Sequence, residues 1–114
     1  MRLKIITTIE DEYILFKIKS IISVENITSL ENIIYKFIDE KKYILFDLSE
    51  TTFIDSSSLG ILVILNMKLE ENKKQLLFVN INNDIRRIFK STGLDKHLHI
   101  FDDITSAINS FSLN

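Results

Sequence analysis

A near-continuous apolar run over residues 43–48 is the strongest constraint on how this chain folds. A strand that is apolar on both faces must be covered on both, and such strands are usually central and parallel. A segment with helical periodicity, residues 27–38, precedes the run, and a second apolar segment, residues 59–65, follows it. Strands and helices therefore alternate, which predicts βαβ units with helices packed on a partly parallel sheet.

The spacing of the apolar residues predicts the remaining elements. Strands are expected over residues 3–9, 13–18, 43–48, 75–79 and 98–101, the first two as an antiparallel hairpin. Helices are expected over residues 27–38, 59–71, 84–91 and 104–111. Ser23 or Asn26 is available to cap the first helix, and Gly93 suits a left-handed position after the third. We therefore expect an α/β fold, a mixed sheet of about five strands with a parallel centre and about four helices.

Composition excludes several classes of function. At 114 residues the chain is long enough for one domain with a real core, and we expect that domain to span residues 1–114. The formal charge of −2 argues against a nucleic-acid surface. The absence of cysteine excludes disulfides, thiolate metal sites and a thiol nucleophile. With two glycines and no proline, no glycine-rich phosphate loop is possible, and we expect no cofactor and no metal site.

The same sequence lacks signals for export or membrane insertion. Its first residues have neither the apolar core nor the small-residue cleavage site of a signal peptide. Its longest apolar stretch falls far short of the roughly 20 residues that cross a bilayer. We therefore expect a cytoplasmic protein that has no membrane partner.

Asp55, Ser56, Ser57 and Ser58 lie between a predicted strand and a predicted helix. We expect all three hydroxyls on the surface at the amino end of that helix, where unpaired N–H groups and the helix dipole favour an anion. A serine there is accessible to another protein, and the helix end would hold a phosphate placed on it. Asp and Ser are also favoured N-caps, and the spacing alone favours a simple cap over a modified serine. The two interpretations are compatible, because one hydroxyl can cap while its neighbour faces a partner.

The second helix has five consecutive apolar residues, 61–65, so its apolar surface covers the whole circumference. A helix on the surface of a sheet needs only one apolar stripe. Either the final helix covers its outer side, or that side binds a partner protein. Its nearness to the serines favours a partner.

Four segments together resemble a known family. Residues 45–49 end in Asp-Leu-Ser, and residues 53–60 read Phe-Ile-Asp-Ser-Ser-Ser-Leu-Gly. Residues 88–95 contain Thr-Gly-Leu, and residues 100–108 read as a closing strand and helix. This pattern resembles the STAS domain of bacterial anti-sigma-factor antagonists, also called anti-anti-sigma factors. The resemblance covers essentially the whole chain and implies a single STAS-type domain.

The resemblance implies specific site residues. The family's phosphorylated serine follows the motif aspartate, Asp55, and corresponds to Ser56, with Ser57 as a secondary candidate. We expect the partner to contact Asp55, Ser56, Ser57, Ser58, Leu59, Ile61 and Leu62. The chain departs from the family pattern twice. Ser58 replaces the motif glycine, and Ser23 stands where the family usually has an aspartate after the second strand.

The resemblance also implies a partner-switching role in signal transduction and transcription regulation. The unphosphorylated protein would bind an anti-sigma factor that is a serine kinase of the histidine-kinase-like ATPase fold, and so free a sigma factor. Phosphorylation of Ser56 would end the complex, and a metal-dependent serine phosphatase would restore it. The alternative is a STAS scaffold or ligand-binding module that does not switch.

Two other classes fit less well. An enzyme with Ser56 as nucleophile would need a nearby base, but the only histidines, His97 and His99, lie near the other end of the chain. We expect both on a solvated edge. A response-regulator receiver domain could use Asp47 as acceptor. However, residues 11–12, the candidate acidic pair, are followed at once by a strand, and no lysine ends the predicted strand 98–101.

Overall fold

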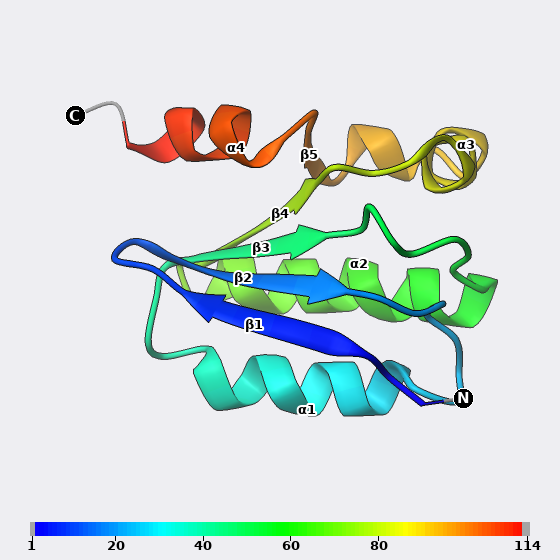
Figure 1. Ribbon diagram of the computed structural model, residues 1–114, viewed down its shortest axis with the longest axis horizontal. Helices are drawn as coiled ribbons and strands as arrows, with labels where there is room; N and C mark the ends of the chain where they lie inside the picture. The colour runs from blue at the N-terminus through cyan, green and yellow to red at the C-terminus, as the bar shows by residue number, and fades with distance from the viewer. Residues whose placement is uncertain (1, 113–114) are drawn as a thin grey trace.

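The five predicted strands form one sheet in sequence order, β1-β2-β3-β4-β5 (Figure 1). The computed structural model describes residues 2–112. The strands are β1 (Ile5–Ile9), β2 (Tyr13–Ile18), β3 (Tyr43–Asp47), β4 (Gln75–Val79) and β5 (His99–Phe101). β1 is antiparallel to β2, whereas every other neighbouring pair is parallel. The predicted mixed sheet with a parallel centre is confirmed.

The helices cover the sheet unequally. They are α1 (Ile27–Phe37), α2 (Ser56–Glu71), α3 (Asn83–Ser91) and α4 (Ile104–Phe111), with a short 3₁₀ turn η1 (Leu94–Lys96) after α3. From β2 to β5 the sheet grows in one direction, and right-handed crossovers then place all connecting helices on one face. Accordingly α1, α2 and α3 bury their apolar residues in one core, while α4 packs on the opposite face.

A chain of phenylalanine rings runs through the larger core. Phe16, Phe46 and Phe78 are register partners on β2, β3 and β4, and their rings meet edge to face at centroid distances of 6.1 and 5.6 Å. Phe37 of α1 and Phe89 of α3 extend the chain at its two ends, each in edge-to-face contact. Such contacts add to the burial energy of the rings. The ring chain thus joins the three strands whose carboxyl ends support the site described below.

Six element boundaries differ from the sequence expectations by one to three residues, and those of α2 and β5 have a clear cause or consequence. α2 begins at Ser56 rather than Leu59, because Asp55 caps it. β5 begins at His99, and Leu98 is buried just before it. Asn26 occupies the N-cap position of α1, but its side chain bonds within the preceding loop, accepting from Ser23 N at 2.9 Å. The expected left-handed glycine after α3 is confirmed at Gly93, with φ of 75°.

Candidate functional site

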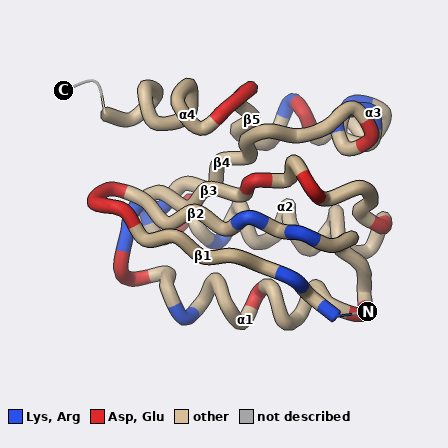
Figure 2. The backbone as a smooth tube through the Cα atoms, in the orientation of Figure 1, with Lys and Arg blue, Asp and Glu red and all other residues tan. Residues whose placement is uncertain are grey.

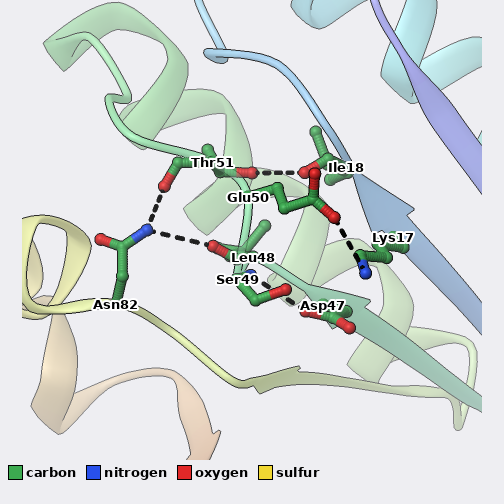
Figure 3. Close-up of polar contacts among 8 residues, drawn as sticks. All are labelled: Lys17, Ile18, Asp47, Leu48, Ser49, Glu50, Thr51 and Asn82. Carbon is green, nitrogen blue, oxygen red and sulfur yellow. Dashed lines mark hydrogen bonds and ion pairs between the residues drawn. The ribbon is translucent and has the colours of Figure 1, made fainter.

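A polar network fixes the loop that joins β3 to α2 (Figure 3). The buried Thr51 hydroxyl donates to the Ile18 carbonyl at 2.9 Å, which ties the loop to the end of β2. The Asn82 side chain donates to the Thr51 carbonyl at 2.6 Å, and its Oδ1 accepts from Ile85 N at 3.0 Å as the N-cap of α3. The loop is therefore held between β2 and α3, which limits how far the start of α2 can move.

The first part of this loop is shaped by carboxylates. Asp47 is 5% exposed, and its Oδ1 accepts from Ser49 N at 2.9 Å, so this carboxylate forms a turn. Glu50 pairs with Lys17 of β2 at 2.9 Å (Figure 3). The hydrogen bond from Lys17 holds the pKa of Glu50 below its usual range. Both side chains of this pair are partly exposed, so it contributes little to stability.

Asp55 is the N-cap of α2 and also binds the loop before α1. Its Oδ1 accepts from Ser58 N at 2.8 Å, and its Oδ2 accepts from Val24 N at 2.9 Å. The backbone adds a parallel bridge, in which Ile22 N donates to the Phe53 carbonyl at 2.9 Å and Asp55 N donates to the Ile22 carbonyl at 3.1 Å. The Asp55 carboxylate and this bridge hold the two loops together.

These contacts lower the pKa of Asp55. The Ser58 hydroxyl has the largest effect on this pKa, followed by the Ser58 amide and then the Val24 amide, while partial desolvation opposes them. The Ser58 hydroxyl approaches the carboxylate without reaching hydrogen-bond geometry, and Ser58 Oγ has no hydrogen-bond partner. Asp55 is therefore ionised at neutral pH and contributes one fixed negative charge beside Ser56.

The expectation that all three serine hydroxyls lie on the surface is wrong for Ser58. Ser56 and Ser57 are exposed, but Ser58 is fully buried. The reason is the early start of α2: with Ser56 as its first residue, Ser58 falls on the helix face that packs on the sheet. Leu62 lies on the same face and is fully buried. Neither Ser58 nor Leu62 is accessible to a partner, which corrects two of the expected contact residues.

Ser56 lies at the edge of a small apolar groove. Ser56 and Ser57 are the first two residues of the 16-residue helix α2, so their N–H groups have no intrahelical acceptor. The groove has a volume of about 230 Å³ and lies between the start of α2 and the end of α3. Its lining residues are Ser56, Leu59, Gly60, Val63, Thr92 and Leu94. The groove combines the exposed Ser56 hydroxyl with mostly apolar walls, whereas the Thr92 hydroxyl donates to the Ile88 carbonyl at 2.7 Å.

The wall of the groove opposite α2 is formed by Thr92 and Leu94, which the sequence did not indicate as contact residues. Thr92 and Leu94 follow α3, more than thirty residues from the serines along the chain. The signal that could have identified them is present, because they belong to the Thr-Gly-Leu match in residues 88–95. Only the fold shows that this segment lies against α2.

The outer side of α2 is not covered by the final helix, so the first of the two alternatives for this side is wrong. α4 packs on the other face of the sheet, where Ala107 joins Leu45, Leu77 and Val79. As a result Ile64 and Met67 remain 51% and 56% exposed. The exposed apolar side of α2 begins next to the groove and continues along the helix.

Comparison with known proteins agrees with this geometry. Residues 4–107 match the STAS domain family. This chain belongs to the STAS domain family. Over 101 residues this STAS domain is 29% identical to the anti-sigma-B factor antagonist of Staphylococcus aureus, covering 88% of the chain and 94% of that relative. The membership of the STAS family that the four sequence segments indicated is thereby confirmed.

Two solved structures share the fold of this STAS domain. A candidate anti-sigma factor antagonist from Thermotoga maritima superposes with a TM-score of 0.85 at 23% identity, covering 95% of this chain and 94% of that one. The Bacillus cell fate determinant SpoIIAA in its phosphorylated form superposes with a TM-score of 0.67 at 16% identity, covering 96% and 98%. The predicted α/β STAS fold is therefore confirmed.

The two departures of this STAS domain from the family pattern lie on either side of Asp55. Ser58 directs its side chain inward, away from the surface where Ser56 lies. Ser23 uses its hydroxyl locally, accepting from Glu25 N at 3.3 Å in the loop that Asp55 also contacts. Both serines therefore act within the scaffold of the site.

The histidines of this STAS domain lie away from Ser56. His97 and His99 are exposed, and His99 Nε2 lies 3.4 Å from Glu70 Oε1, near the carboxyl end of α2. Ser56 is at the other end of the same helix, roughly 20 Å away at 1.5 Å per residue. Within residues 2–112, no helix is long and apolar enough to cross a membrane, and no group of three or more histidine or acidic side chains could hold a metal ion.

Proposed function

We propose that this STAS domain is a cytoplasmic anti-sigma-factor antagonist whose partner contact is switched by phosphorylation of Ser56. The observation that carries the proposal is the position of Ser56, exposed at the start of α2 and lining an apolar groove. The Staphylococcus relative, named an anti-sigma-B factor antagonist, supports the antagonist role. The Bacillus relative, described in a phosphorylated form, supports the modification.

In the unmodified state the groove accepts an apolar side chain of the partner. Leu59, Val63 and Leu94 supply the walls, and the exposed side of α2 at Ile64 extends the contact. A neutral Ser56 hydroxyl at the edge of such a contact is buried at modest cost if it finds one hydrogen bond. The partner is an anti-sigma factor, and its capture by this domain frees the sigma factor.

Phosphorylation changes this balance through charge. A phosphoserine carries about −1.5 to −2 charges at neutral pH. At Ser56 it would stand beside the ionised Asp55 and in front of an apolar wall, so burial against a partner would require removing its hydration. A penalty of about 3–4 kcal/mol weakens binding roughly several-hundred-fold. In the free protein the unpaired amides at the start of α2 stabilise the phosphate, so the fold is retained.

The cycle uses the partner's own ATP. The partner, a serine kinase of the histidine-kinase-like ATPase fold, transfers the γ-phosphoryl group of ATP to Ser56 Oγ, with release of ADP and of the hydroxyl proton. A metal-dependent serine phosphatase then transfers the phosphoryl group to water and regenerates the hydroxyl. The domain itself supplies the acceptor and the docking surface.

Ser57 provides a matched control for the acceptor. It is exposed like Ser56 and adjoins the same helix end, but it does not line the groove. The purified protein is incubated with ATP and each histidine-kinase-like anti-sigma factor encoded in the same genome, and the modified residue is located by mass spectrometry. We expect phosphate on the wild type and on Ser57→Ala, and none on Ser56→Ala.

The same measurement distinguishes the phosphorylation switch from the alternative role as a scaffold or ligand-binding module. Modification at Ser57 alone would contradict the assignment of Ser56. If none of the kinases modifies the protein, and Ser56 is also unmodified in protein purified from its own host, a scaffold or ligand-binding module that does not switch is the correct description.

A further inference from the structure

Strand β1 has one unpaired edge among the residues that the structure describes. It is bonded only to β2 and forms the outer margin of the sheet (Figure 1). Natural edge strands are usually protected from other chains by charged residues, proline or bulges. The five residues of β1 are Ile-Ile-Thr-Thr-Ile, and Ile6 and Ile9 are 49% and 54% exposed. β1 therefore lacks the usual protection along its length.

The register of the hairpin shows which backbone groups face this free edge. Glu10 N donates to the Tyr13 carbonyl at 2.9 Å, and Lys19 N donates to the Lys4 carbonyl at 2.7 Å. Hydrogen-bonded pairs alternate along an antiparallel ladder, so the residues of β1 that bond to β2 are Ile6 and Thr8. The N–H and C=O groups of the other three, Ile5, Thr7 and Ile9, point away from β2.

These outward groups are arranged for a second copy of the same strand. A twofold axis at Thr7 places Thr7 opposite its own equivalent and Ile5 opposite Ile9 of the second copy. In an antiparallel pair each of these opposed residues exchanges two backbone hydrogen bonds. The groups that face the free edge are therefore the ones that this register pairs.

Charge complementarity selects the same register. Lys4 immediately precedes β1, and Glu10 immediately follows it. Figure 2 shows basic residues at the start of β1 and acidic residues in the β1–β2 hairpin. About the axis at Thr7, Lys4 of each copy lies opposite Glu10 of the other. Both residues are exposed, and opposite charges at directly opposed positions stabilise a strand pair.

We propose that β1 is a homodimerisation edge, pairing antiparallel with β1 of a second copy about Thr7 to form one continuous sheet. On the face away from α1, the exposed Ile6 meets Thr8 of the second copy. On the α1 face, the exposed Ile9 meets the partly buried Ile5. The edge lies outside the Ser56 groove, so both grooves stay free in the dimer, and the inference does not depend on the function of Ser56.

The test exploits the symmetry of the charge pairs. Sedimentation of the full chain is measured from roughly 10 μM to roughly 1 mM for Lys4→Glu, Glu10→Lys and the double variant. Each single variant creates two like-charge contacts per dimer and should weaken dimerisation by roughly tenfold or more, while the double variant restores wild-type affinity. Lys90→Glu on α3 and Glu71→Lys at the end of α2 make the same charge changes at exposed positions, on helices next to β4 rather than β1 in the chain order of the sheet, and should leave dimerisation unchanged. Thermal unfolding confirms that each variant is folded.

Amide hydrogen exchange provides the second readout. As concentration rises, the amides of Ile5, Thr7 and Ile9 should become protected, whereas those of Ile6 and Thr8 should be protected at every concentration. A protein that stays monomeric at roughly 1 mM would overturn the proposal. This outcome includes the case in which β1 pairs with a strand of a different protein and not with a second copy. A dimer that is insensitive to the single charge reversals, or whose Ile5, Thr7 and Ile9 amides still exchange rapidly, would also overturn it.

Discussion

The Asp55 carboxylate accepts a hydrogen bond from the Val24 amide across 2.9 Å, joining the start of α2 to the loop between β2 and α1. The other oxygen of the same carboxylate caps α2 through Ser58 N. Asp55 therefore positions the helix end that presents Ser56, whether or not Ser56 is modified. Its place beside the acceptor has a structural reason as well as an electrostatic one.

Loss of this carboxylate should destabilise the fold in two distinguishable steps. Asp55→Asn keeps a cap oxygen for Ser58 N but loses one of the two acceptors, whereas Asp55→Ala loses both. We expect thermal unfolding to give a midpoint for Asp55→Asn between those of the wild type and Asp55→Ala. Equal midpoints for the wild type and Asp55→Asn would show that the contact with Val24 contributes nothing in solution, and an equal midpoint for Asp55→Ala would show the same for the cap.

The lowered pKa of Asp55 predicts a specific pH dependence. Because ionised Asp55 is stabilised in the folded state, its contribution to stability is complete above its usual pKa of 3.8 and is lost as the pH falls through the lowered value. Asp55→Asn has no such titration. The difference in unfolding midpoint between the wild type and Asp55→Asn should therefore shrink as the pH falls from about 6 to about 2. A constant difference would contradict the direction of the shift.

The buried position of the Ser58 hydroxyl leads to a prediction about the stability of Ser58 variants. Ser58 Oγ has no hydrogen-bond partner, which disfavours its burial, but the same hydroxyl favours the ionised form of Asp55. Because these two effects oppose each other, Ser58→Ala should lie within about 1 kcal/mol of the wild type in stability at neutral pH. Ser58→Gly, which restores the residue found in the family motif, should be less stable than Ser58→Ala by up to about 1 kcal/mol because glycine is a poor helix former. Denaturant unfolding measures both. A loss of more than about 1 kcal/mol in Ser58→Ala would show that the hydroxyl hydrogen-bonds to Asp55 in solution.

Substitutions at two neighbouring residues can distinguish how much the groove and the outer side of α2 each contribute to partner binding. Val63 lines the groove, whereas Ile64 is more exposed and does not. We expect Val63→Glu to weaken anti-sigma factor binding more than Ile64→Glu, because a carboxylate in the groove loses its hydration on contact. Pull-down titration against the partner measures both. The reverse order would move the centre of the contact from the groove to the outer side of the helix.

The sequence predicted the parallel centre of the sheet because residues 43–48 form an apolar run, and a strand with this pattern must be covered on both faces. It predicted the position of Ser56 because strand, hydroxyl cluster and helix are contiguous. It could not predict the inward direction of Ser58, which depends on helix α2 starting three residues earlier than its apolar residues suggest. That start depends in turn on the contacts of Asp55.

The position of α4 was also beyond local reasoning. Which face the final helix covers depends on the order of the strands, and the apolar pattern of residues 104–111 is the same for either face. For the same reason the sequence could not place Thr92 and Leu94 in the groove beside Ser56. Both results follow from the tertiary arrangement of β4, α3 and β5.

The central claim is that charge at Ser56 switches the partner contact. The direct test is calorimetric titration of the anti-sigma factor that phosphorylates the protein, using unmodified protein, the Ser56 phosphoprotein, Ser56→Ala and Ser56→Asp. We expect the unmodified protein and Ser56→Ala to bind alike, and the phosphoprotein to bind roughly several-hundred-fold more weakly while its unfolding midpoint stays within a few degrees of the unmodified value. Ser56→Asp should fall between them, because it carries less charge. Equal affinity for the modified and unmodified proteins would contradict the account.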